Sequence, residues 1–347
     1  MKKILLAGIF AICLQNVVPA QSRYAIVISE IMADPTPSAG LPAAEWIELY
    51  NRSTTVINLQ GWRMGDASGQ SGPLPNYNLL PGAYLLLCSS GNLPQMSTYG
   101  AAIGVSSFPS LDNDGDLLVL RNAAGQTMHA VRYSIDWYHN PVKQDGGWSL
   151  EMINTNEPCE SNTNWTASTA TQGGTPGRIN AVTNNTSAAT PPALLRSYST
   201  DAQTINLVWN KPLDSMAAAI AARYQLNNGI TVLQATAIPP LFDEVQLRLQ
   251  QPLQAQTVYS VAVSAVSDCN GRIVAPNSAV PAGLAEELLP ADCILNELLF
   301  YPRPDGDDYV EVFNNSKKIA NAAHLFIANR NAAGALTTVK PLSATPW

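Results

Sequence analysis

Residues 24–51 read YAIVISEIMADPTPSAGLPAAEWIELYN. Two short runs rich in β-branched and aromatic residues, 24–29 and 46–50, enclose a loop that contains Pro and Gly. Runs of this length and composition, bounded by turn residues, indicate β-strands. Similar runs occur at 84–88, 117–120, 205–209, 245–249 and 259–263. In several of them apolar and polar residues alternate, which is typical of an antiparallel strand with one buried face.

The rest of the composition fits an all-β protein. The 25 prolines and 22 glycines fall mostly between the strand-like runs, which indicates frequent tight turns. Only residues 214–224 (DSMAAAIAARY) have a helical composition, with Asp214 or Ser215 available as the N-cap. Many short strands without repeating strand–helix units predict β-sandwiches, and 347 residues are enough for two or three domains.

The first 20 residues, MKKILLAGIFAICLQNVVPA, have the three parts of a secretory signal peptide. We expect cleavage between Ala20 and Gln21 and a secreted or cell-surface protein. The apolar stretch is too short to cross a bilayer, and we expect no membrane span in the mature chain. Without Lys2 and Lys3 the chain has 17 basic and 26 acidic side chains, a formal charge of −9. Such an acidic chain is not expected to bind nucleic acid.

Four cysteines remain after the leader: Cys88, Cys159, Cys269 and Cys293. An even number in an exported chain predicts two disulfides, for which three pairings exist. Chain order favours Cys88–Cys159 with Cys269–Cys293, so that each bond stays within or beside one module. Four reduced, buried thiols are the alternative. A zinc site is disfavoured because no two cysteines have the CxxC spacing.

The start and the end of the chain repeat one pattern. ISEIM (28–32) followed by EWIELYN (45–51) parallels LNELL (295–299) followed by DYVEVFN (308–314). The second copy stops at Trp347, before counterparts of the later strands of the first. We therefore expect a fragment or a prematurely ended reading frame. A polar linker at 183–191 and a second break near 281–291 separate the modules.

Longer motifs carry a resemblance to known families. The succession SEIMADP, EWIELYN, INLQGWRMGD, LPGAYLLLC, LDNDGDLLVL and GQTMHAVRY (residues 29–133) resembles the lamin tail domain of secreted bacterial proteins. GGWSLEMI, CESNTNW and GGTPG (146–177) resemble its bacterial extension, and residues 293–347 resemble half of a second copy with Leu325 in place of Trp62. LVWNKPLDS, VQLRLQQPL and VYSVAVSAVSDCNG resemble a bacterial Ig-like domain of surface-layer proteins.

These resemblances imply tandem Ig-like antiparallel β-sandwiches: a lamin tail domain at 21–182, an Ig-like domain at 192–283 and a partial second lamin tail domain at 292–347. They also imply a non-catalytic binding or structural protein outside the cytoplasm, with an extracellular protein or glycan as partner and no cofactor. Two alternatives are the N-terminal accessory part of a longer secreted hydrolase or nuclease, and a calcium-stabilised adhesin.

The one candidate cation site is the segment 112–116. Asp112, Asp114 and Asp116 offer oxygen ligands suited to Ca²⁺. However, Gly115 comes one place too early for an EF-hand loop, and no glutamate follows at the twelfth position. The flanking LLVL run favours a hairpin turn instead.

Other candidate sites are weaker. Glu30 and Glu48 recur as Glu297 and Glu311 and could form a carboxylate pair, although we favour a structural role. His129, His139 and His324 have no partner at a chelating spacing, and neither HExxH nor GxSxG occurs. Trp137 and Tyr138 lie in a polar stretch and are the best candidates for ligand contact. Packing under the 136–148 loop is the alternative for this pair.

Overall fold

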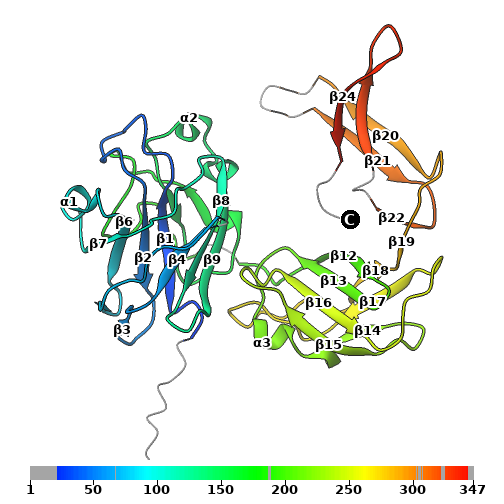
Figure 1. The fold of residues 1–347 in the computed structure, drawn as a ribbon, viewed down its shortest axis with the longest axis horizontal. Coiled ribbons are helices and arrows are strands. Elements are labelled where there is room, and N and C mark those ends of the chain that lie inside the picture. Colours follow the sequence, from blue (N-terminus) through cyan, green and yellow to red (C-terminus); the bar gives the residue numbers. More distant parts are fainter. Residues whose placement is uncertain are drawn as a thin grey trace, which may run out of the picture.

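The structure is a computed structural model that describes residues 22–66, 68–186, 189–301, 303, 306, 308–321 and 325–342. Strands make up nearly all of its regular structure and most of them pair antiparallel, so the predicted all-β class is confirmed. Figure 1 shows three groups of strands in chain order. None of the helices in the described residues is long and apolar enough to cross a membrane. The leader with its cleavage site after Ala20, and His324, lie outside the described residues.

The first group of strands, here called the first sandwich, has two sheets around one core. The larger sheet has the order β11-β10-β1-β2-β6-β7 and the smaller the order β4-β8-β9. The larger consists of β1 (Ile26–Met32), β2 (Trp46–Asn51), β6 (Tyr84–Ser89), β7 (Ala102–Val105), β10 (Leu150–Met152) and β11 (Trp165–Ala167). The smaller consists of β4 (Arg63–Gly65), β8 (Gly115–Arg121) and β9 (Thr127–Ser134). Short elements fill the connections: β3 (Ile57–Asn58), β5 (Asn78–Leu79), α1 (Leu93–Met96), η1 (Ile135–Tyr138), α2 (Pro141–Gln144) and η2 (Asn162–Asn164).

Strand β1 is more deeply buried than its sequence indicates. Ile26, Ile28 and Ile31 belong to the core between the two sheets. A bulge between Ile28 and Glu30 changes the register with β2. The opposite face of β1 is also buried, because residues 173–182 cross it, so all seven residues of the strand are buried.

The second group of strands, the second sandwich, has sheets β12-β13-β16-β15 and β14-β17-β18 around a core of its own. Its strands are β12 (Leu194–Asp201), β13 (Thr204–Trp209), β14 (Tyr224–Leu226), β15 (Val232–Ala237), β16 (Glu244–Leu249), β17 (Tyr259–Val263) and β18 (Ser278–Ala282). In β16 and β17 buried and exposed residues alternate, which confirms the predicted half-buried strands. The predicted helix at 214–224 is shorter than expected: α3 (Ser215–Ala218) is followed by η3 (Ala221–Arg223). Asp214 caps α3 by accepting from the N–H groups of Met216 and Ala217.

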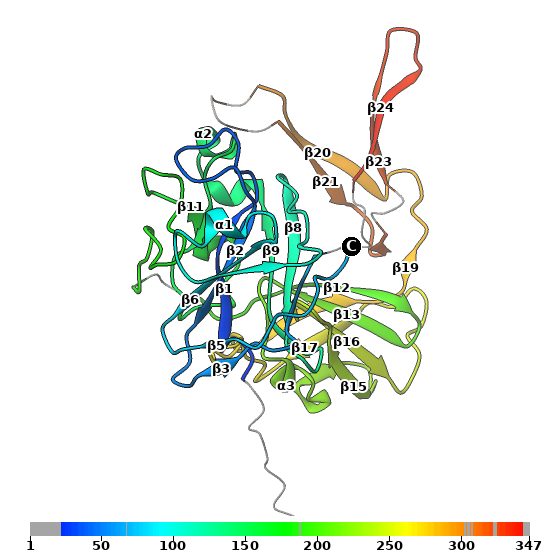
Figure 2. The same ribbon diagram turned by 60° about the vertical axis from the view of Figure 1, so that its left-hand side comes forward.

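The third group reproduces the start of the first sandwich. Strand β20 (Cys293–Leu299) pairs with β21 (Tyr309–Asn314), and the register shift just before Glu297 matches the one before Glu30. The other strands are β19 (Ala285–Glu286), β22 (Ile319–Ala320), β23 (Phe326–Arg330) and β24 (Leu336–Pro341). The hairpin β23–β24 projects from the rest of the molecule in both views (Figures 1 and 2). The repeat seen in the sequence is therefore also a repeat of strand pairing, while the predicted module limits stay predictions.

The disulfide pairing predicted from chain order is wrong. The bond joins Cys159 to Cys269, 110 residues apart and with 6.0 Å between their Cα atoms. Cys88 cannot reach Cys159, because it lies on β6 in a separate buried cluster with Trp46 and Met96. Cys159 packs instead beside Tyr24 and Val27, at the place where the second sandwich meets the first. Cys293 is half-buried and free.

Thiol labelling should show this pairing directly. In the mature chain unfolded without reductant, an alkylating reagent should label Cys88 and Cys293 and leave the other two cysteines unlabelled. In the folded protein Cys88 should react far more slowly than Cys293, because it is fully buried and burial raises the pKa of its thiol. Mass spectrometry of the labelled peptides measures both results; a labelled Cys159 would contradict the structure.

Candidate functional site

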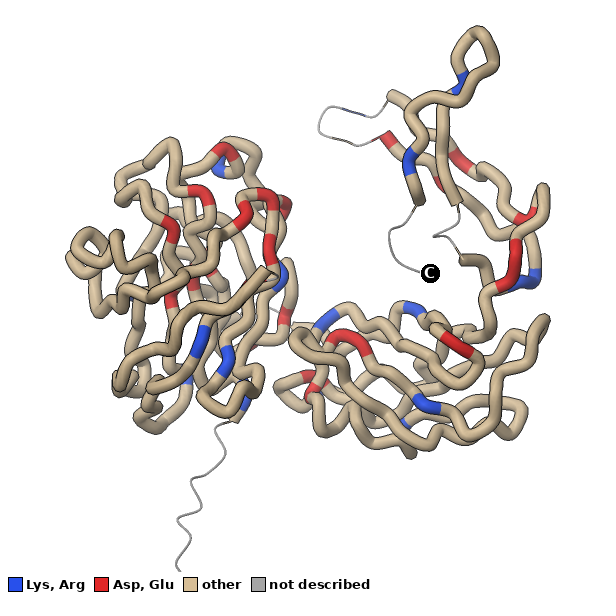
Figure 3. The backbone as a smooth tube through the Cα atoms, viewed as in Figure 1, with Lys and Arg blue, Asp and Glu red and all other residues tan. Residues whose placement is uncertain are grey.

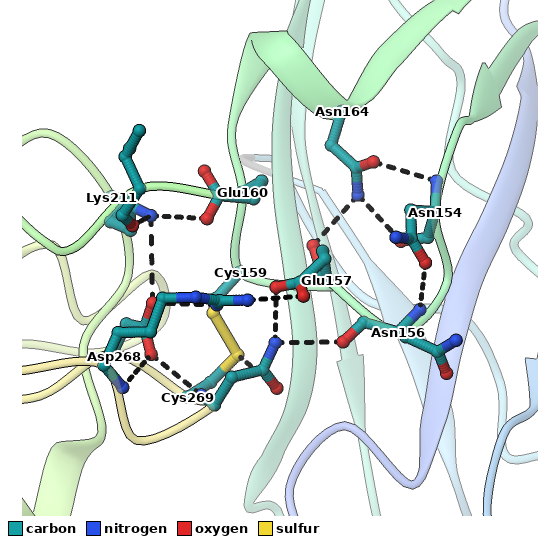
Figure 4. A network of polar contacts seen from close by, with 12 residues as sticks. Asn154, Asn156, Glu157, Cys159, Glu160, Asn164, Lys211, Asp268 and Cys269 are labelled. Carbon is teal, nitrogen blue, oxygen red and sulfur yellow. Dashed lines mark hydrogen bonds and ion pairs between the residues drawn. A yellow bond between two sulfur atoms is a disulfide. The ribbon is translucent and has the colours of Figure 1, made fainter. Parts of the chain in front are cut away.

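A polar junction surrounds the disulfide between the first and second sandwiches (Figure 4). At its centre is Lys211, whose side chain is only 2% exposed. Its ammonium group contacts the carboxylate of Glu160 from the first sandwich and lies 3.8 Å from that of Asp268 from the second. It also donates to the carbonyl of Thr190. A buried cation is thus balanced by carboxylates from both sides, which fixes the two sandwiches relative to each other.

Charged and amide side chains extend this junction around the disulfide. Arg272 lies 2.5 Å from Glu157 of the first sandwich and 3.3 Å from Asp268. The amide of Asn270, next to Cys269, donates to the carbonyl of Asn156 at 2.9 Å and to Glu157 at 2.6 Å. No motif or spacing in the sequence indicated these pairs. The acids that adjoin both cysteines, Glu160 and Asp268, are the one signal that could have suggested a polar contact there.

A second contact lies on another part of the junction. The guanidinium of Arg23 donates to the carbonyls of Leu213 and Leu241, each at 3.2 Å. It also lies over the rings of Tyr24 and Phe242, with its central carbon 4.5 and 4.0 Å from their centroids. Leu241 in turn packs against β8 and β9. This second contact between the sandwiches limits their relative rotation.

A groove opens beside this junction. A pocket of about 150 Å³ is lined by Trp137 and Trp165 of the first sandwich and by Pro212 and Asp243 of the second. A wider, open depression of about 600 Å³ is lined by Asp112, Asp116 and Tyr133. Both are also lined by Arg132 and Trp137, and we call the two together the Trp137 groove.

The two aromatic residues predicted for ligand contact have different environments. Tyr138 is 4% exposed and its hydroxyl donates to the carbonyl of Trp148, so its ring offers no surface to a ligand and the prediction for it is wrong. It packs under the loop, as the alternative interpretation had it. Trp137 is half-buried: it packs against Trp165, with 6.2 Å between ring centroids, and it lines the groove. A contact role for Trp137 stays a prediction.

The segment 112–116 forms a turn, which is the interpretation favoured from the sequence. Asn113 and Asp114 are the turn residues, and Gly115 donates its N–H to the carbonyl of Asp112 at 3.2 Å. Tyr133 donates its hydroxyl to the same carbonyl at 2.7 Å. The turn leads from a loop into β8 and is not a hairpin between paired strands. In the part of the chain that the structure describes, no three His, Cys, Asp or Glu side chains are arranged to hold a metal ion.

Three glutamates lie side by side under the surface of the first sandwich. Glu30 on β1 is the register partner of both Glu48 on β2 and Glu151 on β10, and all three are 0% exposed. From the sequence we predicted that Glu30 and Glu48 form a pair, but we did not predict Glu151 beside them. The strand-like run SLEMI around Glu151 could have indicated it. Complete burial leaves no access for a sugar between these acids, which supports the structural role favoured from the sequence.

The partner of these acids is the segment 173–182 (GGTPGRINAV), here called the strap. Its backbone N–H groups at Thr175 and Gly177 donate to Glu30 and Glu48, each at 2.7 Å. The N–H of Val182 donates to Glu151 at 3.0 Å. Backbone donors need partners when they are buried, and the acids supply them. The Gly-rich strap is therefore fastened across β2, β1 and β10.

Burial changes the protonation of this cluster. Desolvation, with a further contribution from Glu151, raises the pKa of Glu30 to about 8. Desolvation and the neighbouring Glu30 also raise the pKa of Glu48 well above its usual value. His129, which accepts from the N–H of Ile28 at 2.9 Å, has its pKa lowered by burial to about 3. His129 is thus neutral near pH 7 and holds the backbone of β1.

Replacement of Lys211 should weaken the junction. In Lys211→Met the carboxylates of Glu160 and Asp268 lose their buried cation, and we expect the free energy of unfolding to fall by about 3–5 kcal/mol. Denaturant titration of the oxidised protein measures this change. Exposed Lys317→Met is the matched control and should stay within about 0.5 kcal/mol of the parent. Equal stability of the two variants would contradict the structure.

The glutamate cluster should make stability depend on pH. Glu30 binds its proton more tightly in the folded chain, so its contribution is present below about pH 4.5 and is lost as the pH rises through about 8. Glu30→Gln should remove this loss, so that the variant gains stability relative to the parent between pH 5 and 9, by about 1.4 kcal/mol per unit of pKa difference. Thermal or chemical unfolding at a series of pH values measures the difference. A constant difference across this range would refute it.

Comparisons with known proteins bear on the first sandwich. Residues 19–134 match the family model described as Lamin Tail Domain, a range that ends with β9. Comparison with curated proteins finds no match. The sequence resemblance to a lamin tail domain is confirmed over this range.

Three solved structures of a bacterial S-layer protein, SbsC, are similar to part of this chain. The match covers a third or less of the length of each of those structures. The N-terminal part of SbsC is 15% identical (TM-score 0.26; 43% of this chain and 33% of that chain). The rSbsC(31-844) structure is 17% identical, with a TM-score of 0.26, and the match covers 43% of this chain and 19% of that chain. The structure of domains 1-6 is 15% identical, with a TM-score of 0.26, and the match covers 43% of this chain and 22% of that chain. The family match and the two-sheet architecture together identify the N-terminal part of the chain, over residues 19–134, as a lamin tail domain.

Proposed function

We propose that this chain is a non-catalytic structural and binding protein of the cell exterior, in which the first two sandwiches form one rigid unit that presents the Trp137 groove. The observation that carries the proposal is the junction, where a disulfide, a buried lysine and an inserted arginine couple the sandwiches. Disulfides persist in oxidising compartments, so the bond supports the export predicted from the leader. Such coupling prevents hinge motion between the sandwiches, which would otherwise move the loops that bind a partner.

A glycan is the ligand that fits the Trp137 groove best. Trp137 lines the groove, and an indole ring can stack its flat apolar face on sugar C–H groups. Arg132 and Asp112 line the same depression and can hydrogen-bond to sugar hydroxyls. A few polar groups beside an aromatic ring are typical of a small-molecule binding site. The smaller pocket of the groove has walls from both sandwiches, so its shape depends on their fixed placement.

A glycan array tests this function. The oxidised chain of residues 21–347 should bind a defined set of glycans, and Trp137→Ala should weaken that binding by roughly tenfold, or about 1.4 kcal/mol. Tyr77→Ala is the matched control: this half-buried aromatic residue also packs against the first core but does not line the groove. Circular dichroism confirms that both variants fold.

Three outcomes would contradict the proposal. The first is that the chain binds no glycan on the array. The second is that Trp137→Ala binds glycans as tightly as the parent does. The third is that the chain binds an extracellular protein but no glycan, and that Trp137→Ala abolishes this binding. The groove would then still be the binding site, but its ligand would be a protein.

A further inference from the structure

The sequence contains two Asn-Gly pairs, Asn228-Gly229 and Asn270-Gly271. Asparagine deamidates most readily before glycine, because glycine has no side chain to hinder closure of the succinimide ring. Asn228 lies in an exposed loop between β14 and β15 of the second sandwich. Asn270 follows Cys269, whose disulfide joins the two sandwiches, and its side chain belongs to the polar junction. The same reactive pair is thus present in an exposed loop and at a contact between sandwiches.

Residues 268–271 form a tight turn in which the backbone of the Asn-Gly pair is hydrogen-bonded. Gly271 donates its N–H to the carbonyl of Asp268 at 3.1 Å. Asn270 donates its own N–H to the carboxylate of Asp268 at 2.9 Å. The backbone nitrogen of Gly271 is the atom that attacks in deamidation, and in this turn its proton is engaged. Asn270 is exposed as a residue, so water has access to it.

The first sandwich holds the side-chain amide of Asn270. Its nitrogen donates to the carbonyl of Asn156 at 2.9 Å and to one carboxylate oxygen of Glu157 at 2.6 Å. The other carboxylate oxygen of Glu157 lies 2.5 Å from the guanidinium of Arg272, so this acceptor is itself held in place. Figure 3 shows acidic and basic positions close together where the two sandwiches adjoin. The nitrogen that deamidation expels is therefore bonded to two acceptors while the junction is closed.

Conversion of this amide to an acid would reverse the polarity of the contact. An amide nitrogen donates hydrogen bonds, whereas an ionised carboxylate only accepts them. The product would place a carboxylate beside that of Glu157 and beside the carbonyl of Asn156, with no donor between them. Like charges at this distance repel, and two former acceptors would lose their donor. An isoaspartate would also add a methylene group to the main chain next to Cys269.

We propose that Asn270 is a site of spontaneous deamidation that the closed junction protects and that makes an opening of the junction permanent. When the junction opens, the backbone nitrogen of Gly271 attacks the side-chain carbonyl carbon of Asn270. A new C–N bond forms, the bond from that carbon to the amide nitrogen breaks, and this nitrogen leaves as ammonia with the backbone proton. Water then opens the succinimide ring to aspartate or isoaspartate. The new carboxylate opposes reclosure beside Glu157.

Peptide mapping by mass spectrometry measures the reaction at both asparagines of one molecule. The oxidised chain of residues 21–347 is incubated in mildly alkaline buffer, folded and in urea. In the folded chain Asn270 should react roughly tenfold more slowly than in the unfolded chain, or slower still, because hydrogen bonds to its amide must break first. Glu157→Ala removes the charged acceptor and should raise the folded-state rate at Asn270 by roughly tenfold. The rate at Asn228 should be the same in both folded chains and serves as the internal reference.

The matched control is Glu287→Ala, which removes an exposed acid away from the junction and should leave the rate at Asn270 unchanged. The consequence of the reaction is tested with Asn270→Asp, which has the aspartate product, and with Asn228→Asp, which has the same change in the exposed loop. Hydrogen exchange in residues 156–160 and 267–273 should be roughly tenfold faster in Asn270→Asp, because the new carboxylate favours the open junction, and unchanged in Asn228→Asp.

Three results would overturn the proposal. The first is that Asn270 reacts as fast in the folded parent as in the unfolded chain, since the junction would then give no protection. The second is that Glu157→Ala leaves the rate at Asn270 unchanged. The third is that Asn270→Asp exchanges hydrogen like the parent, since the product would then not hold the junction open.

Discussion

The link between Cys159 and Cys269, with Lys211 buried beside it, is the constraint on which the arrangement of the first two sandwiches depends. Each sandwich has its own apolar core, so neither needs the other to bury its strands. What the link determines is their relative placement. The smaller pocket of the Trp137 groove takes one wall from each sandwich and depends on that placement. A buried lysine between two carboxylates also tolerates little displacement, because each charge depends on the others for compensation.

The two copies of the strand pair show how much surroundings decide the environment of a side chain. Glu30 and Glu297 follow the same bulge and face the same kind of partner, yet one is fully buried and the other is exposed. The difference comes from β10 and the strap, which are more than a hundred residues from Glu30 in the chain. Under the strap, an acid acts as an acceptor for backbone donors and retains its proton near neutral pH. Local sequence alone carries none of this information.

Much of the fold could nevertheless be predicted from local pattern. The alternation in 245–249 and 259–263, the turn at 112–116 and the cap at Asp214 depend on near neighbours, and the structure has all three. The disulfide could not be predicted, because chain order assumed that each bond stays in one module. Tyr138 illustrates the same limit at a candidate site. Its polar sequence context indicated exposure, but the side chain turns inward and reaches the carbonyl of Trp148.

The position of the disulfide also decides how the chain would carry a mechanical load. A force applied to the two ends passes from residue 159 to residue 269 through a covalent bond, and the 110-residue separation between them is bypassed. Strands β12 to β17 lie within that loop and cannot be drawn out while the bond is intact. Reduction would release a hidden length of roughly 350–400 Å at full extension. A tether built in this way stays short under tension in an oxidising medium and lengthens in a reducing one.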